Sequence, residues 1–132
     1  MKKYCNSCGK LLSRDSKGEL CYNCRVLKNR EDTINHWLLT GDTGCGVATT
    51  LRNAIRDYIL DTQHHKCSIC GIDDNWNGKP LKFILDHIDG DASNNFQDNL
   101  RLICPNCDSQ LPTFKARNKN SARTHRVKYY RV

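Results

Sequence analysis

The pattern of hydrophobic and polar positions predicts helices in the first half of the chain. Residues 25–40 mix aliphatic and polar side chains in the way of a helix, and a glycine-rich break at 41–46 follows them. Further along, Leu51, Ile55 and Ile59 recur at the spacing of one helix face. The sequence therefore predicts two helices separated by a glycine-rich connection.

The second half of the chain predicts strands. Residues 81–85 and 100–103 alternate between apolar and polar side chains, which is typical of half-buried strands. A polar loop at 86–98 separates them, and Pro105 is placed to open a short helix. Residues 75–80 are expected to form a loop. Two helices followed by strand, loop, strand and helix predict an α+β fold.

The cysteines change this picture because the predicted core is small. The chain has 132 residues, of which 38% are hydrophobic, against about 45–50% in typical globular domains. Eight of the nine cysteines form four C-x2-C pairs. The pairs are Cys5/Cys8, Cys21/Cys24, Cys67/Cys70 and Cys104/Cys107, and Cys45 stands alone. Metal ions or disulfides are therefore expected to supply part of the stability.

Metal binding is favoured over disulfide formation. The chain leads from Met1 directly into a cysteine motif with no apolar signal segment before it, and thiols stay reduced without secretion. Two C-x2-C pairs can place four thiolate sulfurs around one zinc ion at about 2.3 Å. We expect two structural Zn²⁺ sites, one in a zinc ribbon at residues 1–25 and one between the later pairs.

The charge of the chain indicates a polyanionic partner. Lys and Arg number 21 against 14 Asp and Glu, a formal charge of +7. Solubility alone also accounts for such an excess. No stretch is apolar and long enough to span a bilayer, and no helix has a basic face that would favour a membrane surface. We therefore expect no membrane partner.

Basic side chains gather in two places. Arg52 and Arg56 lie one turn apart on the polar face of the second predicted helix. The run from Lys115 to Arg131 is basic and is either a disordered tail or an arm that orders along phosphates. The side chains expected to contact nucleic acid are Arg52, Arg56, Arg101, Lys115, Arg117, Lys119, Arg123 and Arg126.

The densest cluster of reactive side chains lies between residues 85 and 108. It reads LDHIDGD at 85–91, NN at 94–95, DNLR at 98–101 and CPNCD at 104–108. This arrangement resembles the HNH nucleases, or ββα-metal superfamily, in the subgroup whose motif lies between two C-x2-C zinc knuckles. The resemblance covers about residues 64–120. It implies a small zinc-stapled ββα-metal nuclease fold, with preceding helices and an N-terminal zinc ribbon.

The resemblance implies a role for each matching residue. His87 is expected to be the general base at the end of the first strand, and Asp86 a ligand of a divalent metal. Asn99 matches the family's central asparagine, whose carbonyl group is expected to orient the imidazole, with Asn95 as the second candidate. The family commonly has a metal-binding histidine or asparagine after the last cysteine, where this chain has Asp108.

Two carboxylates favour a hard metal ion. Asp86 and Asp108 offer oxygen ligands of the kind that Mg²⁺ and Mn²⁺ prefer. Such an ion withdraws charge from a phosphodiester and stabilises the leaving 3′ oxygen, while a neutral imidazole removes a proton from water. The expected function is metal-dependent hydrolysis of DNA by an endonuclease that uses Mg²⁺ or Mn²⁺.

The same interpretation divides the chain into four segments. We expect a zinc ribbon at 1–25, a helical DNA-contacting segment at 26–63, the HNH core at 64–120 and a basic tail at 121–132. The expected partners are double-stranded DNA, a second copy in a homodimer, and phage packaging or terminase factors. The expected location is the cytoplasm of a bacterial cell or of an infected host.

Two other functions stay open. A zinc-ribbon DNA-binding or regulatory protein with a degenerate HNH site would bind without cutting, but it leaves His87 beside Asp86 unexplained. A thiol oxidoreductase would use Cys104 and Cys107, whose C-x2-C motif opens a predicted helix. The matching pair earlier in the chain argues against the oxidoreductase.

Overall fold

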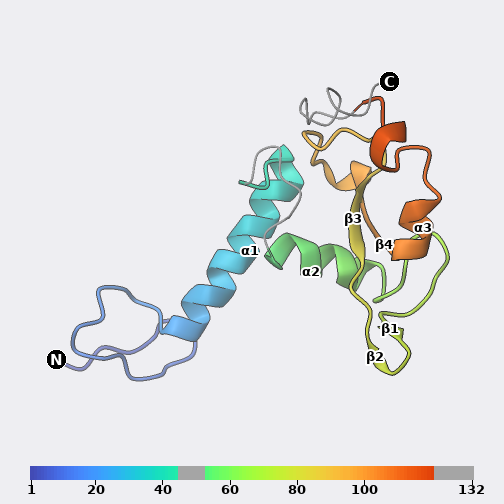
Figure 1. Cartoon of the computed structure of the whole chain (residues 1–132). Helices are drawn as coiled ribbons and strands as arrows, with labels where there is room; N and C mark the ends of the chain where they lie inside the picture. Colours follow the sequence, from blue (N-terminus) through green and yellow to red (C-terminus); the bar gives the residue numbers. More distant parts are fainter. Residues whose placement is uncertain (45–52, 121–132) are drawn as a thin grey trace.

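The structure confirms an α+β fold (Figure 1). This computed structural model describes residues 1–44 and 53–120. Its helices are α1 (Tyr22–Thr40), α2 (Asn53–Thr62) and α3 (Pro105–Ser109), with 3-10 turns η1 (Gln97–Asn99) and η2 (Lys115–Arg117). Its strands are β1 (Asn75–Trp76), β2 (Lys79–Pro80), β3 (Ile84–His87) and β4 (Leu100–Ile103). Within these residues no helix has the length and apolar character that crossing a bilayer requires.

α1 begins earlier than the helix predicted at 25–40. It starts at Tyr22, directly after Cys21, so the second cysteine pair of the N-terminal segment lies on the first turn of the helix. Of the residues of α1 only Trp37 is buried, while aliphatic side chains such as Leu39 are exposed. The helix therefore projects from the body of the protein, with the N-terminal segment at its far end (Figure 1).

The second half of α1 is attached to α2. Arg30 Nη2 lies 2.8 Å from Asp57 Oδ2 on α2. The Trp37 and Tyr58 rings meet edge to face, with centroids 5.9 Å apart. Trp37 and Ile55 belong to the same buried cluster. The projecting helix is thus rooted in the same core as the strands.

The hairpin of β3 and β4 is the centre of the second half. The strands are antiparallel, with Ile84 opposite Ile103 and His87 opposite Leu100. β4 lies where the alternation predicts it, whereas β3 begins and ends later than the predicted strand and includes His87. Leu102 and Ile103 are fully buried, so β4 anchors the hairpin in the core.

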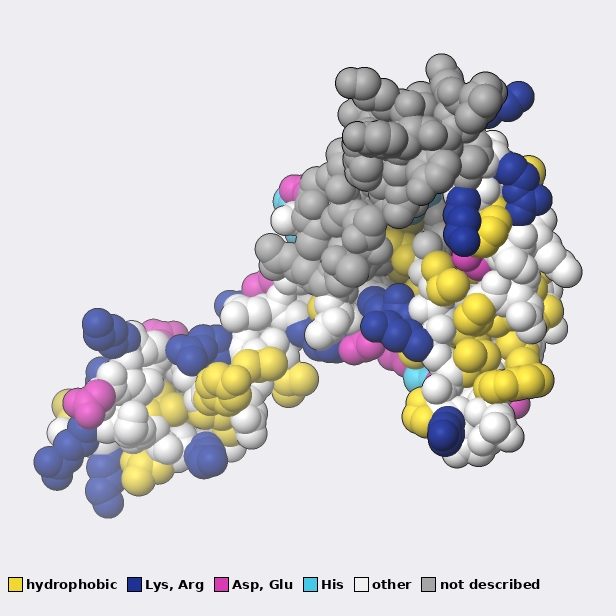
Figure 2. Space-filling model, in the orientation of Figure 1, with side chains coloured by type: hydrophobic (Ala, Val, Ile, Leu, Met, Phe, Trp, Pro, Cys, Tyr) yellow, Lys and Arg dark blue, Asp and Glu magenta, His cyan; other side chains and the backbone are white. Residues whose placement is uncertain are grey.

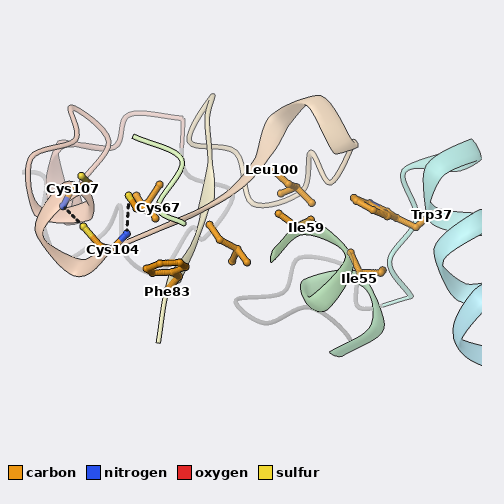
Figure 3. Packing of buried hydrophobic residues seen from close by; sticks show 10 residues of the cluster. Trp37, Ile55, Ile59, Cys67, Phe83, Leu100, Cys104 and Cys107 are labelled. Atoms are coloured by element: carbon orange, nitrogen blue, oxygen red, sulfur yellow. Dashed lines mark hydrogen bonds between the residues drawn. The ribbon is translucent and has the colours of Figure 1, made fainter. Parts of the chain in front are cut away.

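The buried cluster lies between the hairpin and the helices (Figure 3). It contains Trp37, Ile55, Ile59, Phe83, Leu100, Leu102 and Ile103, together with Cys67, Cys104 and Cys107. Figure 3 shows the cysteines at one end of the cluster and Trp37 at the other. A group of thiols therefore closes one end of a small hydrophobic core.

A second short hairpin lies where the sequence predicts a loop. β1 and β2 pair with Asn75 opposite Pro80. Between them Asn77 and Gly78 have positive φ angles of 52° and 70°. Two successive positive φ angles match the tight turn that Asn-Gly favours in hairpins. The expectation of a loop at 75–80 is wrong, because this dipeptide is itself a hairpin signal.

Gly41 at the end of α1 provides a test of the fold. Its φ is 72°, its N–H donates to Trp37 O at 2.8 Å, and a Cβ there would lie 2.8 Å from ring carbons of Phe96. We expect Gly41→Ala to lower the free energy of unfolding by about 1 kcal/mol or more, because backbone and contact are both strained. Chemical denaturation measures this. Gly18→Ala, which meets nothing within 4 Å, is the control, and equal stability of the two variants contradicts the prediction.

Candidate active site

Two clusters of four cysteines bring together residues that are distant in sequence. Within each cluster the sulfur atoms lie within 4.8 Å of one another. The first cluster holds Cys5, Cys8, Cys21 and Cys24, and the second holds Cys67, Cys70, Cys104 and Cys107. All eight are free thiols. The structure thus assembles both sets that the C-x2-C spacing predicts.

The spacing of the sulfur atoms fits tetrahedral zinc. Bonds of about 2.3 Å from zinc to thiolate place two sulfurs of a tetrahedron about 3.8 Å apart, whereas a disulfide bond is about 2.05 Å long. Cys8 Sγ lies 3.7 Å from Cys21 Sγ, and Cys70 Sγ lies 3.7 Å from Cys104 Sγ. Both clusters could hold a structural Zn²⁺ with no ligand position left for water.

Backbone N–H groups stabilise negatively charged sulfur atoms in the clusters, and thiolates are the form that binds a cation. Cys104 N donates to Cys67 Sγ at 3.3 Å, and Cys107 N donates to Cys104 Sγ at 3.4 Å. Backbone hydrogen bonds, above all from Cys21, lower the pKa of Cys5 to about 6. Burial and then the neighbouring thiols raise the pKa of Cys107 to about 12. Four crowded thiols resist full ionisation unless a divalent cation offsets the charge.

His87 ends β3 with a buried imidazole. Its Nε2 lies 2.8 Å from Asn95 Oδ1. An amide oxygen only accepts hydrogen bonds, so Nε2 is the donor in this contact. Nδ1 has no hydrogen-bond partner in the part of the chain that the structure describes. The family resemblance predicts this contact for Asn99. In the structure Asn95, the second candidate, makes it.

Asn99 instead holds the loop between β3 and β4. Its Nδ2 donates to Asp89 Oδ1 at 2.9 Å and to Asn94 O at 2.8 Å, and its Oδ1 accepts from Asp89 N at 3.0 Å. Burial raises the pKa of Asp89, but hydrogen bonds from Asn94, the Asp91 backbone and Asn99 outweigh it, and the pKa is lowered. Asn99 and an ionised Asp89 thus shape the loop that carries Asn95.

Asp86 and Asp108 lie close enough for their charges to interact. Burial and then the charge of Asp86 raise the pKa of Asp108. Asp86 is buried opposite Arg101, whose Nε donates to Asp86 Oδ2 at 2.7 Å. Asp86 Oδ1 accepts no hydrogen bond from residues 1–44 or 53–120. A divalent cation would relieve the repulsion between the two carboxylates, so this pair fits an oxygen-ligated metal.

The two carboxylates and His87 are not assembled as tightly as the cysteines. Among the described residues, only the two cysteine clusters place three or more ligand atoms within 4.8 Å of one another. Asp86, His87 and Asp108 do not form such a group. The described residues therefore provide no closed cage of ligand atoms for an ion at Asp86, His87 and Asp108.

The segment after α3 supports the same loop. Asn118 Nδ2 donates to Gly90 O at 2.7 Å, and Asn120 Nδ2 donates to Asp89 O at 3.1 Å. Gly90 has a φ of 77°, and a Cβ there would lie 2.5 Å from Asn118 Oδ1. Only glycine allows both the backbone conformation and this approach. The contacts fasten the start of the loop to a later part of the chain.

α1 reaches the loop through Trp37. The indole Nε1 donates to Asn95 O at 2.6 Å, and the side chain is 1% exposed. Asn95 is therefore held by α1 through its backbone, while its side chain holds His87. The sequence gives no signal for this role, because the two residues are 58 positions apart and Trp37 has the pattern of an ordinary core residue.

One curated relative matches the chain across part of its length. Over 54 residues the chain is 46% identical to the H-N-H endonuclease F-TflIV of Escherichia phage T5. The resemblance to HNH endonucleases is confirmed. The match covers 41% of this chain and 23% of the phage protein, so the chain spans about a quarter of that relative's length. No family model and no solved structure matches.

Arg56 and Arg101, both expected at the DNA, have partners in or next to the β3–β4 hairpin. Arg56 Nη2 donates to Phe83 O, and Arg101 is paired with Asp86. Each guanidinium therefore fixes part of the hairpin that carries the HNH residues. Their DNA contacts stay predictions, and Arg101 in particular acts on the candidate metal ligand.

Other basic residues after α3 are exposed. Lys115 Nζ lies 4.9 Å and Arg117 Cζ 5.4 Å from the centroid of the Phe114 ring, and Lys119 is also exposed. Arg52, Arg123 and Arg126 lie outside the described residues. All three described cations of this segment are exposed, although Arg117 Nη2 also donates to Ser109 O at 2.7 Å.

The two clusters predict the metal content of the protein. We expect two Zn²⁺ per chain, and we expect Cys8→Ser and Cys107→Ser each to lose one ion, because a hydroxyl group does not replace a thiolate ligand. Native mass spectrometry counts the ions. Cys45→Ser is the matched control, since Cys45 belongs to no C-x2-C pair, and should keep both. A wild-type protein without zinc, or variants that keep two ions, would disprove the assignment.

Proposed function

We propose that this chain is a metal-dependent DNA endonuclease of the HNH type. The observation that carries the proposal is the buried imidazole of His87, whose ring is held by Asn95 at the end of the strand that also carries Asp86. The similar phage protein is named an endonuclease, which supports nuclease activity in general. The substrate, double-stranded DNA, and the roles of individual residues are part of the proposal.

His87 acts as the general base. With the proton on Nε2, Nδ1 is free to take a proton from the attacking water. Asn95 Oδ1, 2.8 Å from Nε2, fixes the ring and the tautomer. After proton transfer the ring is positively charged, and the same hydrogen bond becomes charge-assisted and stronger. Asn95 thus stabilises the protonated state of His87 as the reaction proceeds.

Asp86 and Asp108 are the proposed ligands of Mg²⁺ or Mn²⁺. Such an ion, when bound, supplies positive charge to the scissile phosphate and to the leaving 3′ oxygen. Arg101 holds Asp86 through one oxygen and leaves the other open. Asp108 follows Cys107 on α3, so the C-terminal cysteine cluster fixes where this carboxylate lies.

A binding protein without cleavage activity is the second candidate. The ion pair between Arg101 and Asp86 favours it, because the guanidinium already neutralises one candidate ligand. In that case the exposed Lys115, Arg117 and Lys119 would bind phosphates and the HNH residues would have no chemical role. A homodimer, phage packaging factors and a cytoplasmic location stay predictions, as do the four segment boundaries.

Replacing His87 tests the chemical step. We expect His87→Ala to slow plasmid cleavage in Mg²⁺ or Mn²⁺ by at least about 100-fold, because general-base catalysis typically supplies that factor or more, and to leave the Kd for duplex DNA unchanged. His36→Ala, an exposed histidine on α1, is the control. Equal cleavage by both variants rules out His87 as the base. DNA binding without cleavage by the wild-type protein supports the second candidate.

Replacing Asn95 tests the orientation of the base. We expect Asn95→Ala to lower kcat by about 10–100-fold, the usual effect of losing a group that orients a reactive residue, with no change in Kd. Steady-state cleavage of a short duplex in excess over the protein measures kcat. Ser93→Ala, an exposed position on the same loop, should cleave normally. Wild-type kcat in Asn95→Ala would show that the hydrogen bond to His87 has no catalytic value.

A further inference from the structure

We propose that residues 1–30 form a second DNA-binding surface, which grips phosphates of the duplex at a distance from the active site that α1 sets. The proposal rests on the proposed function in one respect, because it takes duplex DNA as the partner. It does not require that the DNA be cut.

The positive charge of the chain is concentrated outside the body that carries the HNH residues. Residues 1–30 contain eight Lys and Arg against two Asp and Glu, a formal charge of +6. Residues 53–120 contain eight Lys and Arg against nine Asp, a formal charge of −1. A Zn²⁺ ion with four thiolates would lower the N-terminal value to about +4. By net charge, the N-terminal segment therefore attracts a polyanion more strongly than residues 53–120 do.

The basic side chains of this segment are available to a ligand. Arg30 is used in the ion pair with Asp57. The others are Lys2, Lys3, Lys10, Arg14, Lys17, Arg25 and Lys28, all exposed and none in an ion pair with a described residue. Figure 2 shows Lys and Arg side chains spread over the lobe at the far end of α1. Unpaired surface cations of this kind suit phosphate oxygens.

The segment holds these cations on a defined backbone. Cys5 N donates to Lys10 O at 2.8 Å, and Asn6 N donates to Glu19 O at 2.9 Å. Asn6 Nδ2 also donates to Glu19 Oε2 at 3.0 Å. With the cysteine cluster, these bonds cross-link the loops without a hydrophobic core. Binding DNA would then need little ordering of the segment, which favours affinity.

α1 sets the distance between the two surfaces. The helix begins at Tyr22 beside the N-terminal cysteines, and Trp37 donates to Asn95 next to His87. At about 1.5 Å per residue this stretch is about 22 Å long. Successive base pairs are about 3.4 Å apart, so the N-terminal segment would reach phosphates about 6–7 base pairs from the active site. A duplex bound by both surfaces is therefore contacted over a longer span than the HNH body covers.

Neutralising the N-terminal cations tests the surface. All proteins carry His87→Ala, so the DNA stays intact, and fluorescence anisotropy measures Kd on duplexes of increasing length and at several salt concentrations. We expect Lys10→Gln/Lys17→Gln to reduce the slope of log Kd against log salt by about 1–2, since each phosphate contact contributes about 0.9. We also expect the affinity of this variant to reach its maximum on a duplex about 6–7 base pairs shorter than the parent protein requires. Lys79→Gln/Lys82→Gln, with the same charge change at exposed positions, is the control and should match the parent protein.

Lengthening α1 tests the distance. Seven residues inserted after Lys28, in the exposed part of α1, add about two helical turns and about 10.5 Å. We expect the affinity of this variant to reach its maximum on a duplex about 3 base pairs longer than the protein without the insertion requires. An unchanged length requirement, or an unchanged salt slope in Lys10→Gln/Lys17→Gln, overturns the proposal. Preferential binding of an acidic peptide over DNA by the N-terminal segment also overturns it. The nuclease proposal fails by a different result: the wild-type protein does not cleave DNA, while binding still depends on duplex length as described.

Discussion

The convergence of Cys67, Cys70, Cys104 and Cys107 is the constraint on which the body of the protein depends. The first pair precedes the β3–β4 hairpin and the second pair follows it, and their sulfurs lie within 4.8 Å. Both ends of the hairpin are thereby fixed at one point. Three of the four cysteines also belong to the buried cluster, so the thiols complete a core that the few apolar side chains could not close alone.

From this fixed end the hairpin presents its loop at the opposite side, where three separate parts of the chain hold it. Asn99 binds it from within, Asn118 from the segment after α3, and Trp37 from α1. The first two hold Asp89 and Gly90 at the start of the loop, while Trp37 holds the backbone of Asn95, whose side chain contacts His87. Hydrogen bonds thus fix the conformation of a mostly polar loop. A fixed loop suits the proposed role of His87, whose imidazole must present one ring nitrogen in a constant direction.

The sequence predicts those features that depend on local spacing. The cysteine pairs, the strand at 100–103 and the helix at Pro105 are all encoded within a few residues. The choice between Asn95 and Asn99 is not local, because it depends on how α1 packs against the loop. The start of α1 at Tyr22 likewise depends on the cysteine cluster, which requires its last pair on a helical turn.

The role of Arg101 is also not predictable from local sequence. By composition it is one more cation for DNA, yet the register of the hairpin sets it opposite Asp86. Lys115 acts in the same sense on Asp108, whose pKa it lowers against the larger effects of burial and Asp86. Each carboxylate thus has a cation near it that offsets part of its charge. A divalent ion gains less there than from two isolated carboxylates, and the phosphate of a bound duplex would add the negative charge that is missing. If Asp86 and Asp108 bind a divalent ion as proposed, we therefore expect the affinity for that ion to be higher in the complex with DNA than in the free protein.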